Sequence, residues 1–375
     1  MRLTNLLTKV CCLTAMLGFI VSDVLAFQTP VISDTTVNIG LLIQDNNSLA
    51  ARYGAELAIR KANETGGFKG KKFRLVIRSM EGPWGTGSKQ AVDLIFKENV
   101  CAIMGSHDGR NAHLVEQVSA KERIVFLSAW ASDPTLAQAF VPWYFSCVPN
   151  DLQQADAFIK EIYDRRKLIR IATISDNGYD SKLAVQSLVK KIKITGKKEP
   201  VQFFYDIPLQ DFNDIFDKII KSGIDGIILF GKPSASLKFM NQMEKRKMKQ
   251  RVFGALSVLD ENESSVQEQE EFKNMILFVS GNWTGPKGLS FRKEYQRLYG
   301  NVPVAVAAYS FDGMSLLIEA IKKSGTDRQE IQKALTIIRF DGVTGPIQFD
   351  EKGKRIGATN LVEINNEIPV DIGKK

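Results

Sequence analysis

The sequence is poor in the side chains that enzymes and metal sites use. It contains two histidines, His107 and His113, among 375 residues. They are six positions apart, which is not the i, i+4 spacing that places two metal ligands on one helix face. There is no CxxC pair or Cys/His spacing suited to zinc, no G-x-S-x-G nucleophile motif and no phosphate-binding GxxxxGK[ST] loop. We therefore expect no enzymatic activity, no metal and no cofactor.

The sequence also lacks a hydrophobic run long enough to cross a bilayer. Residues 10–22 carry no charge, but this stretch is shorter than the ~20 residues that a spanning helix needs, and no later segment is more apolar. Arg2 and Lys9 precede it, and Val24-Leu25-Ala26 follows with residues suited to a signal peptidase. We expect residues 1–26 to be a cleaved signal peptide and the mature chain to be a soluble periplasmic protein, not embedded in the membrane.

The positive charge of the chain lacks the aromatic residues that accompany it in a nucleic-acid platform. The net charge is +8, and removal of Arg2, Lys9 and Asp23 with the signal peptide takes away +1 and leaves +7. The densest basic run, residues 243–251, has no aromatic side chain between its lysines and arginines. We expect a solvated helix face there and no nucleic-acid partner.

Two cysteines remain after the signal peptide, Cys101 and Cys147. An exported protein permits a disulfide, but a bridge needs Cα atoms within ~7 Å. Both cysteines fall in apolar segments that we expect to be separate, non-neighbouring strands of one sheet. Two buried thiols are therefore expected.

What the sequence has in abundance is a regular alternation of short apolar runs and amphipathic stretches. Strands are expected at residues 37–43, 73–79, 100–106, 124–129 and 143–148, and again at 169–175, 201–207, 226–230, 251–256 and 276–280. Helices are expected at residues 48–63, 88–99, 111–121, 151–164, 179–192, 212–222 and 234–247. This alternation is typical of parallel sheets covered by helices on both faces.

The two runs of alternation predict an α/β protein with two doubly wound parallel-sheet lobes. The C-terminal part contains helices near residues 289–299, 304–324 and 326–338 and then short strands, too little for a third lobe. We expect residues 27–150 with 281–350 to form the first lobe, and residues 151–280 with 351–375 to form the second. The chain would cross between the lobes near residues 150, 280 and 350, and three crossings make a hinge.

Several segments, in this order and spacing, resemble one protein family over essentially the whole mature chain. They are Ile39-Gly40-Leu41-Leu42, Gly54-Ala55-Glu56-Leu57-Ala58, residues 63–70, Lys89-Gln90-Ala91-Val92, Ile103-Met104-Gly105-Ser106, Asp176-Asn177-Gly178-Tyr179 and residues 345–350. The chain is similar to type I periplasmic solute-binding proteins of ABC transporters, of the Leu/Ile/Val-binding class. The resemblance implies a hinged protein that closes over a small molecule and hands it to an ABC transporter permease.

Open parallel sheets bind ligands beyond the carboxyl ends of their strands, where helix N-termini also present free N–H groups. Residues 106–111 and 128–134 occupy that place in the first lobe, so Arg110 and Asn111 are candidate ligand contacts. The resemblance implies more. Gly109 falls where the family has a serine that holds the ligand carboxylate, Trp130 where a small residue makes a backbone contact, and Ser132 where a threonine contributes.

In the second lobe the resemblance implies that Tyr179 closes over the ligand. Lys232 falls near a second tyrosine of the family, and Leu256 falls near the acidic residue that anchors an ammonium group. Leu256 cannot pair with a cation, although Asp260 or Glu261 could replace it. Arg110 is able to grip a carboxylate with two hydrogen bonds, and Trp130 offers a flat face. These departures favour an organic acid or another planar polar solute over a branched-chain amino acid.

The expected function is therefore the extracytoplasmic capture of a small polar organic solute for an ABC importer. The solute would be an organic acid, an amino acid or an amide, and the protein is expected to be a monomer. The alternative is a ligand sensor that docks on a membrane receptor or sensor kinase.

Overall fold

The computed structural model describes residues 36–105, 108–138, 141–208, 211–260, 275–279, 285–357, 360–365 and 368–371. The predicted signal peptide lies outside this part of the chain. Within these ranges, no helix has both the length and the apolar character that a membrane span requires.

The first sheet is parallel throughout and contains β1 (Thr36–Ile43), β2 (Lys72–Ser79), β3 (Ala102–Gly105), β4 (Val125–Ser128) and β5 (Tyr144–Ser146). Its strand order is β2-β1-β3-β4-β5, so the direction of winding reverses between β1 and β3. All residues of β3, β4 and β5 are buried. Continuous apolar strands of this kind belong in a sheet covered on both faces.

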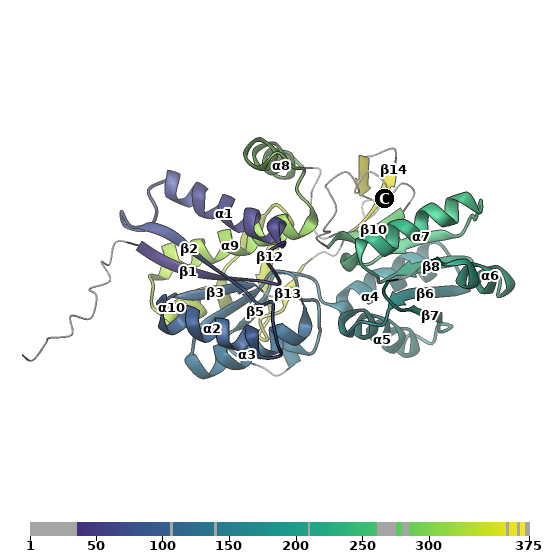
Figure 1. Ribbon diagram of the computed structural model, residues 1–375, viewed down its shortest axis with the longest axis horizontal. Coiled ribbons are helices and arrows are strands. Elements are labelled where there is room, and N and C mark those ends of the chain that lie inside the picture. The colour runs from purple at the N-terminus through teal and green to yellow at the C-terminus, as the bar shows by residue number, and fades with distance from the viewer. Residues whose placement is uncertain are drawn as a thin grey trace, which may run out of the picture. The chain divides into compact units, whose positions relative to one another are not determined.

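Helices cover both faces of this sheet. α2 (Thr86–Phe96) and α3 (Gly109–Glu122) lie on one face, while α1 (Leu49–Glu64) and α9 (Ala305–Ser324) lie on the other (Figure 1). α8 (Pro286–Tyr299) and α10 (Arg328–Ile337) accompany α9. α1 and α9 approach closely at Gly54, where an added Cβ would lie 2.2 Å from the carbonyl oxygen of Ala307. The Ser310 hydroxyl also donates to the carbonyl of Ala51, at 2.6 Å.

The second sheet repeats the same winding. β6 (Ile171–Asp176), β7 (Val201–Tyr205), β8 (Gly226–Leu229), β9 (Arg251–Gly254) and β10 (Met275–Val279) are parallel in the order β7-β6-β8-β9-β10. β14 (Asn360–Asn365) and β15 (Ile368–Asp371) extend it as antiparallel strands beside β10. Its helices are α4 (Asp151–Ile159), which continues into the π-helix η2 (Lys160–Arg165), α5 (Tyr179–Ile194), α6 (Asn213–Lys221) and α7 (Pro233–Lys245).

The predicted architecture is confirmed, because two doubly wound parallel sheets alternate with helices close to the expected positions. The sequence did not indicate two short 3-10 turns, η1 (Leu136–Gln138) and η3 (Leu256–Leu259). β11 (Phe340–Gly342), β12 (Gly345–Phe349) and β13 (Arg355–Ile356) form a third, antiparallel sheet.

A buried polar network fastens this third sheet to the first. Asp312 of α9 accepts hydrogen bonds from the amides of Val343 and Thr344 and from the Thr344 hydroxyl, at 2.6–2.8 Å. The buried Arg355 guanidinium donates to the carbonyls of Cys147 and Thr344, at 2.7 and 2.8 Å. The charged groups are thus matched by hydrogen bonds, as buried charges must be.

Cys101 and Cys147 are buried and free, as expected. They lie next to β3 and β5, which are separated in the sheet by β4. Their sulfurs approach the carbonyls of Asn38 and Ser128, each at 3.3 Å. Burial raises the pKa of both thiols to about 12.

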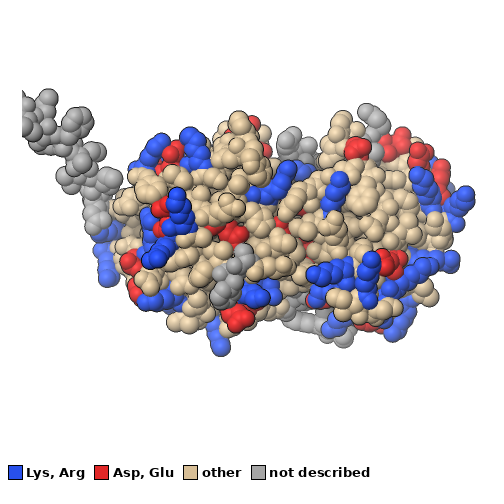
Figure 2. Space-filling model, turned by 90° about the horizontal axis from the view of Figure 1, so that it is seen from below, with Lys and Arg blue, Asp and Glu red and all other residues tan. Residues whose placement is uncertain are grey.

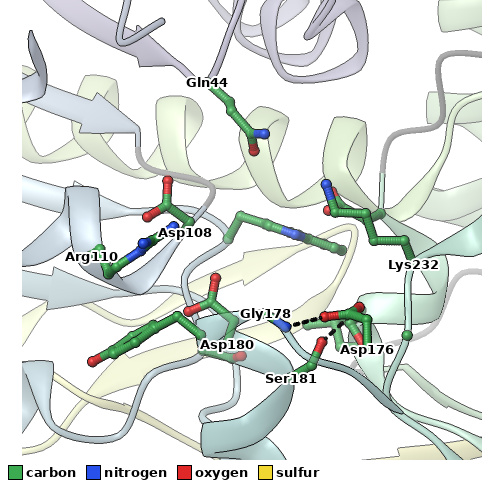
Figure 3. A pocket seen from close by; sticks show the side chains of 15 residues that line it. Gln44, Asp108, Arg110, Asp176, Gly178, Asp180, Ser181 and Lys232 are labelled. Atoms are coloured by element: carbon green, nitrogen blue, oxygen red, sulfur yellow. Dashed lines mark hydrogen bonds between the residues drawn. The ribbon is translucent and has the colours of Figure 1, made fainter. Parts of the chain in front are cut away.

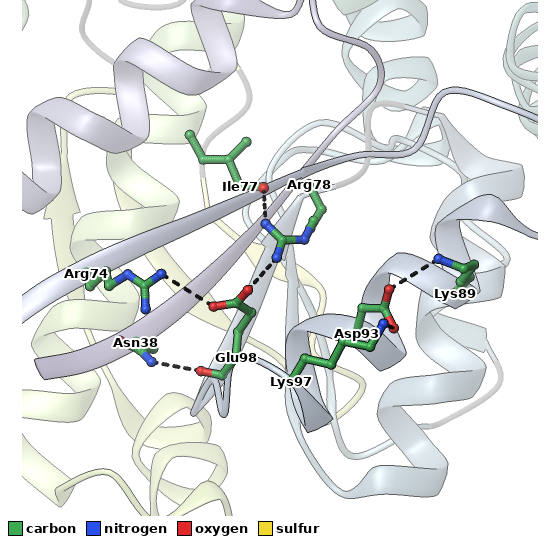
Figure 4. A network of polar contacts seen from close by, with 8 residues as sticks. All are labelled: Asn38, Arg74, Ile77, Arg78, Lys89, Asp93, Lys97 and Glu98. Carbon is green, nitrogen blue, oxygen red and sulfur yellow. Dashed lines mark hydrogen bonds and ion pairs between the residues drawn. The ribbon is translucent and has the colours of Figure 1, made fainter. Parts of the chain in front are cut away.

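Several charged side chains outside the core form ion pairs. Glu98, after α2, accepts from Arg78 and Arg74 of the edge strand β2, and its carbonyl accepts from Asn38 of β1 (Figure 4). Such half-exposed pairs contribute ~0–1 kcal/mol each. On the face shown in Figure 2, Lys and Arg are scattered with Asp and Glu among them. Arg246, in the basic run at the end of α7, pairs with Asp217 at 2.6 Å, in keeping with a solvated helix end.

Substitution Gly54→Ala tests the contact between α1 and α9. A methyl group there must push the two helices apart, and overpacking of this kind costs ~1–3 kcal/mol. We expect the free energy of unfolding, measured by urea denaturation, to fall by about 2 kcal/mol. Arg60→Ala, on the exposed side of the same helix, is the control and should change it by less than about 0.5 kcal/mol. Equal values for the two variants would contradict the close contact.

Candidate functional site

One pocket is lined by segments that follow the carboxyl ends of strands from both sheets. Its volume is about 230 Å³, and Figure 3 shows side chains converging on it from several elements. The lining residues are Gln44, Asp108, Arg110, Trp130, Ser132, Asp176, Gly178, Tyr179, Asp180, Ser181, Gly231, Lys232, Leu256, Ser257 and Asp260. This is where doubly wound sheets bind ligands, beyond the strand ends.

Three strands of the first sheet supply one part of the lining. Gln44 directly follows β1, and Asp108 and Arg110 lie at the start of α3, which follows β3. Trp130 and Ser132 follow β4. The Trp130 ring is buried and packs edge-on against Tyr309 of α9, with ring centroids 5.8 Å apart, so its position is fixed by the core behind it.

Three strands of the second sheet supply the rest. Asp176 is the last residue of β6, and its carboxylate accepts from the Gly178 amide at 2.7 Å and from the Ser181 hydroxyl at 3.0 Å (Figure 3). Lys232 is the N-cap residue of α7, after β8. Leu256 lies in η3, after β9, and its amide donates to the Gln154 side chain at 2.9 Å.

The structure brings most of the sequence-predicted site residues to this pocket. Arg110, Trp130, Ser132, Tyr179, Lys232 and Leu256 all line it. Gly109 and Asn111 are not among the lining residues. The Asn111 amide and side chain both bond to the Asp108 carboxylate, at 2.9 and 2.6 Å, and so complete the cap of α3. A ligand contact by Gly109 or Asn111 stays a prediction.

Sequence reasoning missed the polar residues of the second sheet, above all Asp176, Asp180, Ser181 and Ser257. The signal is present in the sequence, because each of these residues follows a predicted strand and the strand-end rule holds for the second sheet as it does for the first. Of the two acids that could replace Leu256 as a partner for a cation, Asp260 lines the pocket, and Glu261 lies outside the described residues.

Two hydrogen bonds join the start of α3 and the loop after β4 to the start of α5. The Gly109 amide donates to Asp180 Oδ1 at 3.0 Å, and the Tyr179 hydroxyl donates to Asp133 Oδ2 at 3.1 Å. The Arg110 guanidinium also stacks over the Tyr179 ring, 5.8 Å from its centroid. Groups following β3 and β4 of the first sheet thus contact groups following β6 of the second.

Asp133 is the acceptor at the centre of these contacts, and its side chain is fully buried. It accepts from the Thr135 amide and hydroxyl, at 2.7 and 2.6 Å, and from His113 Nε2 at 3.1 Å. Burial alone would raise the pKa of Asp133, but the bonds from His113 and Thr135 outweigh it and lower the pKa. The same bond to Asp133, with a second to Glu116, raises the pKa of His113 to about 9. His113 is therefore an imidazolium at neutral pH.

The pocket lining carries more acidic than basic side chains, and this affects the pKa values of Asp180 and Tyr179. Burial raises the pKa of Asp180 to about 6, with Asp108 and Asp133 adding to the effect and the Gly109 amide and Arg110 opposing it. Burial also raises the pKa of Tyr179 to about 12, again reinforced by Asp133. The lining contains four aspartates (Asp108, Asp176, Asp180 and Asp260) against one arginine and one lysine. Across the described ranges, no group of three or more His, Cys, Asp or Glu side chains is arranged to hold a metal ion.

Comparison with known proteins agrees with this architecture. Residues 37–367 match the model of a family described as periplasmic binding proteins. The chain belongs to this family. The predicted resemblance to type I periplasmic binding proteins of the branched-chain amino acid class is therefore confirmed. The expectation that the protein is not an enzyme is also confirmed, because members of this family bind solutes without transforming them.

Individual relatives of this periplasmic binding protein are distant but cover nearly its full length. Leu/Ile/Val-binding protein homolog 1 from Brucella suis is 25% identical over 349 residues, which are 91% of this chain and 92% of the relative. The substrate-binding protein LivJ from Streptococcus pneumoniae, solved with isoleucine, superposes with a TM-score of 0.77 at 20% identity, covering 90% of this chain and 99% of LivJ. A solute-binding protein from R. palustris, solved with benzoate, has a TM-score of 0.76 at 17% identity, covering 90% of this chain and 96% of the R. palustris protein.

Replacement of His113 by alanine should destabilise the protein, because it leaves Asp133 and Glu116 without their shared cation. Hydrogen bonds to charged groups contribute about 1.5–3 kcal/mol, so we expect the free energy of unfolding at pH 6.5 to fall by about 2 kcal/mol. Gln117→Ala, on the exposed side of the same helix, is the control.

The folded-state pKa of His113, about 9, lies above its ordinary value of 6.5. The difference between wild type and H113A should therefore be complete below pH 6.5 and disappear as the pH rises through 9. A pH-independent difference would contradict this assignment.

Proposed function

We propose that this protein captures a small polar organic solute in the periplasm and delivers it to an ABC-type importer, after cleavage of residues 1–26. The observation that carries the proposal is the pocket lined by strand ends of both sheets. A solute there would contact both sheets at once and would favour the conformation in which they are brought together. The three crossings near residues 150, 280 and 350 would then form the hinge of this motion.

The size and polarity of the pocket support a small solute. Its volume of about 230 Å³ is below the ~300–1,000 Å³ of pockets that hold drug-sized ligands. Trp130 supplies one apolar surface, and the buried Ser257 Oγ has no hydrogen-bond partner among the described residues. A buried polar atom of this kind gains from a ligand that pairs with it, because leaving it unpaired costs ~1–3 kcal/mol.

The charge of the lining supports an amino acid or an amide over an organic acid, which revises the preference drawn from the sequence. That preference depended on Arg110, Lys232 and the absence of an acid at position 256. In the structure, four aspartates outnumber these two cations, and a solute nitrogen would meet carboxylate acceptors on both sides. The bound solutes of the two solved neighbours, isoleucine and benzoate, represent these two classes, and the acidic lining fits the first better.

A screen of the purified mature protein by thermal shift tests the proposal. The panel contains amino acids, their amides, and aromatic and aliphatic acids, and native mass spectrometry of protein from the periplasm identifies any solute retained. We expect stabilisation by amino acids or amides, because bound ligand raises the unfolding temperature by mass action. Stabilisation by organic acids alone would overturn the solute class, and no stabilisation together with no retained solute would overturn the proposed function.

Substitution of Tyr179 tests whether the second sheet closes over the solute. Tyr179→Ala removes the ring beneath Arg110 and the bond to Asp133. We expect it to weaken binding of the solute found in the screen by at least about ten-fold, or about 1.4 kcal/mol, by calorimetry. Tyr179→Phe keeps the ring and should lose less affinity for the solute than Tyr179→Ala does. If the affinity of Tyr179→Ala equals that of the wild type, Tyr179 does not belong to the site.

A further inference from the structure

The start of α3 is a position where a solute anion would be expected to bind, but the chain's own carboxylates occupy it. Free N–H groups and the positive end of the helix dipole favour an anion at such a place. Asp108 accepts from the Asn111 amide at 2.9 Å, and Asp180 accepts from the Gly109 amide at 3.0 Å. The second acceptor is 71 residues away in sequence and comes from α5.

Gly109 is the residue that permits this arrangement. A Cβ at position 109 would lie 2.8 Å from Asp180 Oδ1 and 2.9 Å from both Cβ and Oδ2 of Asp133. Any larger residue would have to displace one of these side chains. Gly109 itself is buried, so the Asp180 carboxylate approaches an amide that is shielded from water.

A second aspartate of the lining, Asp176, lies beside the start of α5 on the other side of the pocket. Asp176 Oδ1 accepts from the Gly178 amide at 2.7 Å, and Oδ2 lies 3.0 Å from the Ser181 hydroxyl. Each of these two helix starts therefore has an aspartate of the lining beside it, although α5 has no side-chain bond at its N-cap. At the start of α3, a solute carboxylate would meet amides that are already bonded and carboxylates that repel it.

The negative charge of the Asp180 carboxylate is also not fully balanced by the groups around it. The groups that act on it are Asp108 and Arg110 at the start of α3 and Asp133 after β4, and burial together with the two acids raises its pKa to about 6. Asp151, at the start of α4, is buried as well, and burial raises its pKa well above the ordinary value. A cationic group placed beside these acids would therefore be stabilised.

We propose that Asp180 is a specificity-determining residue, whose carboxylate fills the anion position at the start of α3 and so selects solutes that present a cationic or amide nitrogen there. The inference rests on the proposed function for its biological meaning. Its test needs no knowledge of the natural solute, so the two can fail separately.

Acetate, a carboxylate small enough to enter the position, is the probe. In wild-type protein at pH 7.5, we expect sodium acetate to leave the amide resonance of Gly109 unchanged in ¹H–¹⁵N NMR spectra. In Asp180→Ala, the exposed amide should bind acetate, with an apparent affinity about ten-fold higher, in line with the ~0.3–2 kcal/mol effect of a charge at a helix N-terminus. Sodium chloride at equal ionic strength corrects for screening.

Two further variants separate occupancy of the position from charge. Asp260→Ala removes one negative charge from the same lining but leaves the Gly109–Asp180 bond in place, so acetate should leave its Gly109 resonance unchanged, as in the wild type. Asp180→Asn keeps an acceptor oxygen near Gly109 and should admit less acetate than Asp180→Ala. The proposal is overturned if acetate shifts Gly109 equally in wild type and Asp180→Ala, if it shifts Gly109 in neither, or if Asp260→Ala matches Asp180→Ala.

A measurement on the wild type keeps the proposal testable should the variants fold poorly. The Gly109 amide shift should titrate between pH 5 and 7, because protonation of Asp180, with a pKa of about 6, weakens the bond it accepts. A flat profile over this interval would mean that Asp180 does not occupy the position in solution, and would overturn the proposal.

Discussion

The hydrogen bond from the Gly109 amide to the Asp180 carboxylate joins helices that follow strands of different sheets. It exists because all strands of a doubly wound sheet release their loops at one edge, and the two edges here contribute to one pocket. The bond from Tyr179 to Asp133 adds to it. Because both acceptors are carboxylates, a charged solute placed beside them would strengthen or weaken these two bonds.

Charge balance around the pocket is achieved in two different ways. Asp133 receives bonds from Thr135 and from the His113 imidazolium, so it remains ionised although its side chain is fully buried. Asp180 receives one backbone bond and lies near other acids, so its ionised form is disfavoured. Two aspartates within one site thus differ because of their partners and not because of their burial alone. The first belongs to a saturated network, whereas the second retains capacity for a cation.

The sequence indicated the layers, the winding and the first-sheet half of the site because those properties are local. Strand and helix periodicity lies within each segment. The strand-end rule located Arg110 and the segment 128–134, and the resemblance to the family implied roles for Trp130 and Ser132 within that segment. The same rule covers Asp176 and Asp180, which follow a predicted strand of the second sheet, but the groups that they contact were not predictable in this way. Asp133, Asp176 and Asp180 are ordinary surface-type residues in sequence, and their role depends on which amides they reach. The acceptor on Gly109 is set by the placement of α5 against α3, and no periodicity carries that information.

The two buried thiols have a practical consequence for observing the protein in motion. Cys101 and Cys147 are enclosed within the first sheet, and burial raises the pKa of each to about 12. Since the thiolate is the reactive form, maleimide dyes should leave both unmodified while the protein is folded. Cysteines introduced on exposed positions of α2 and α6 would then take up the label selectively. The native background would not need to be removed before the distance between the dyes is followed during solute binding.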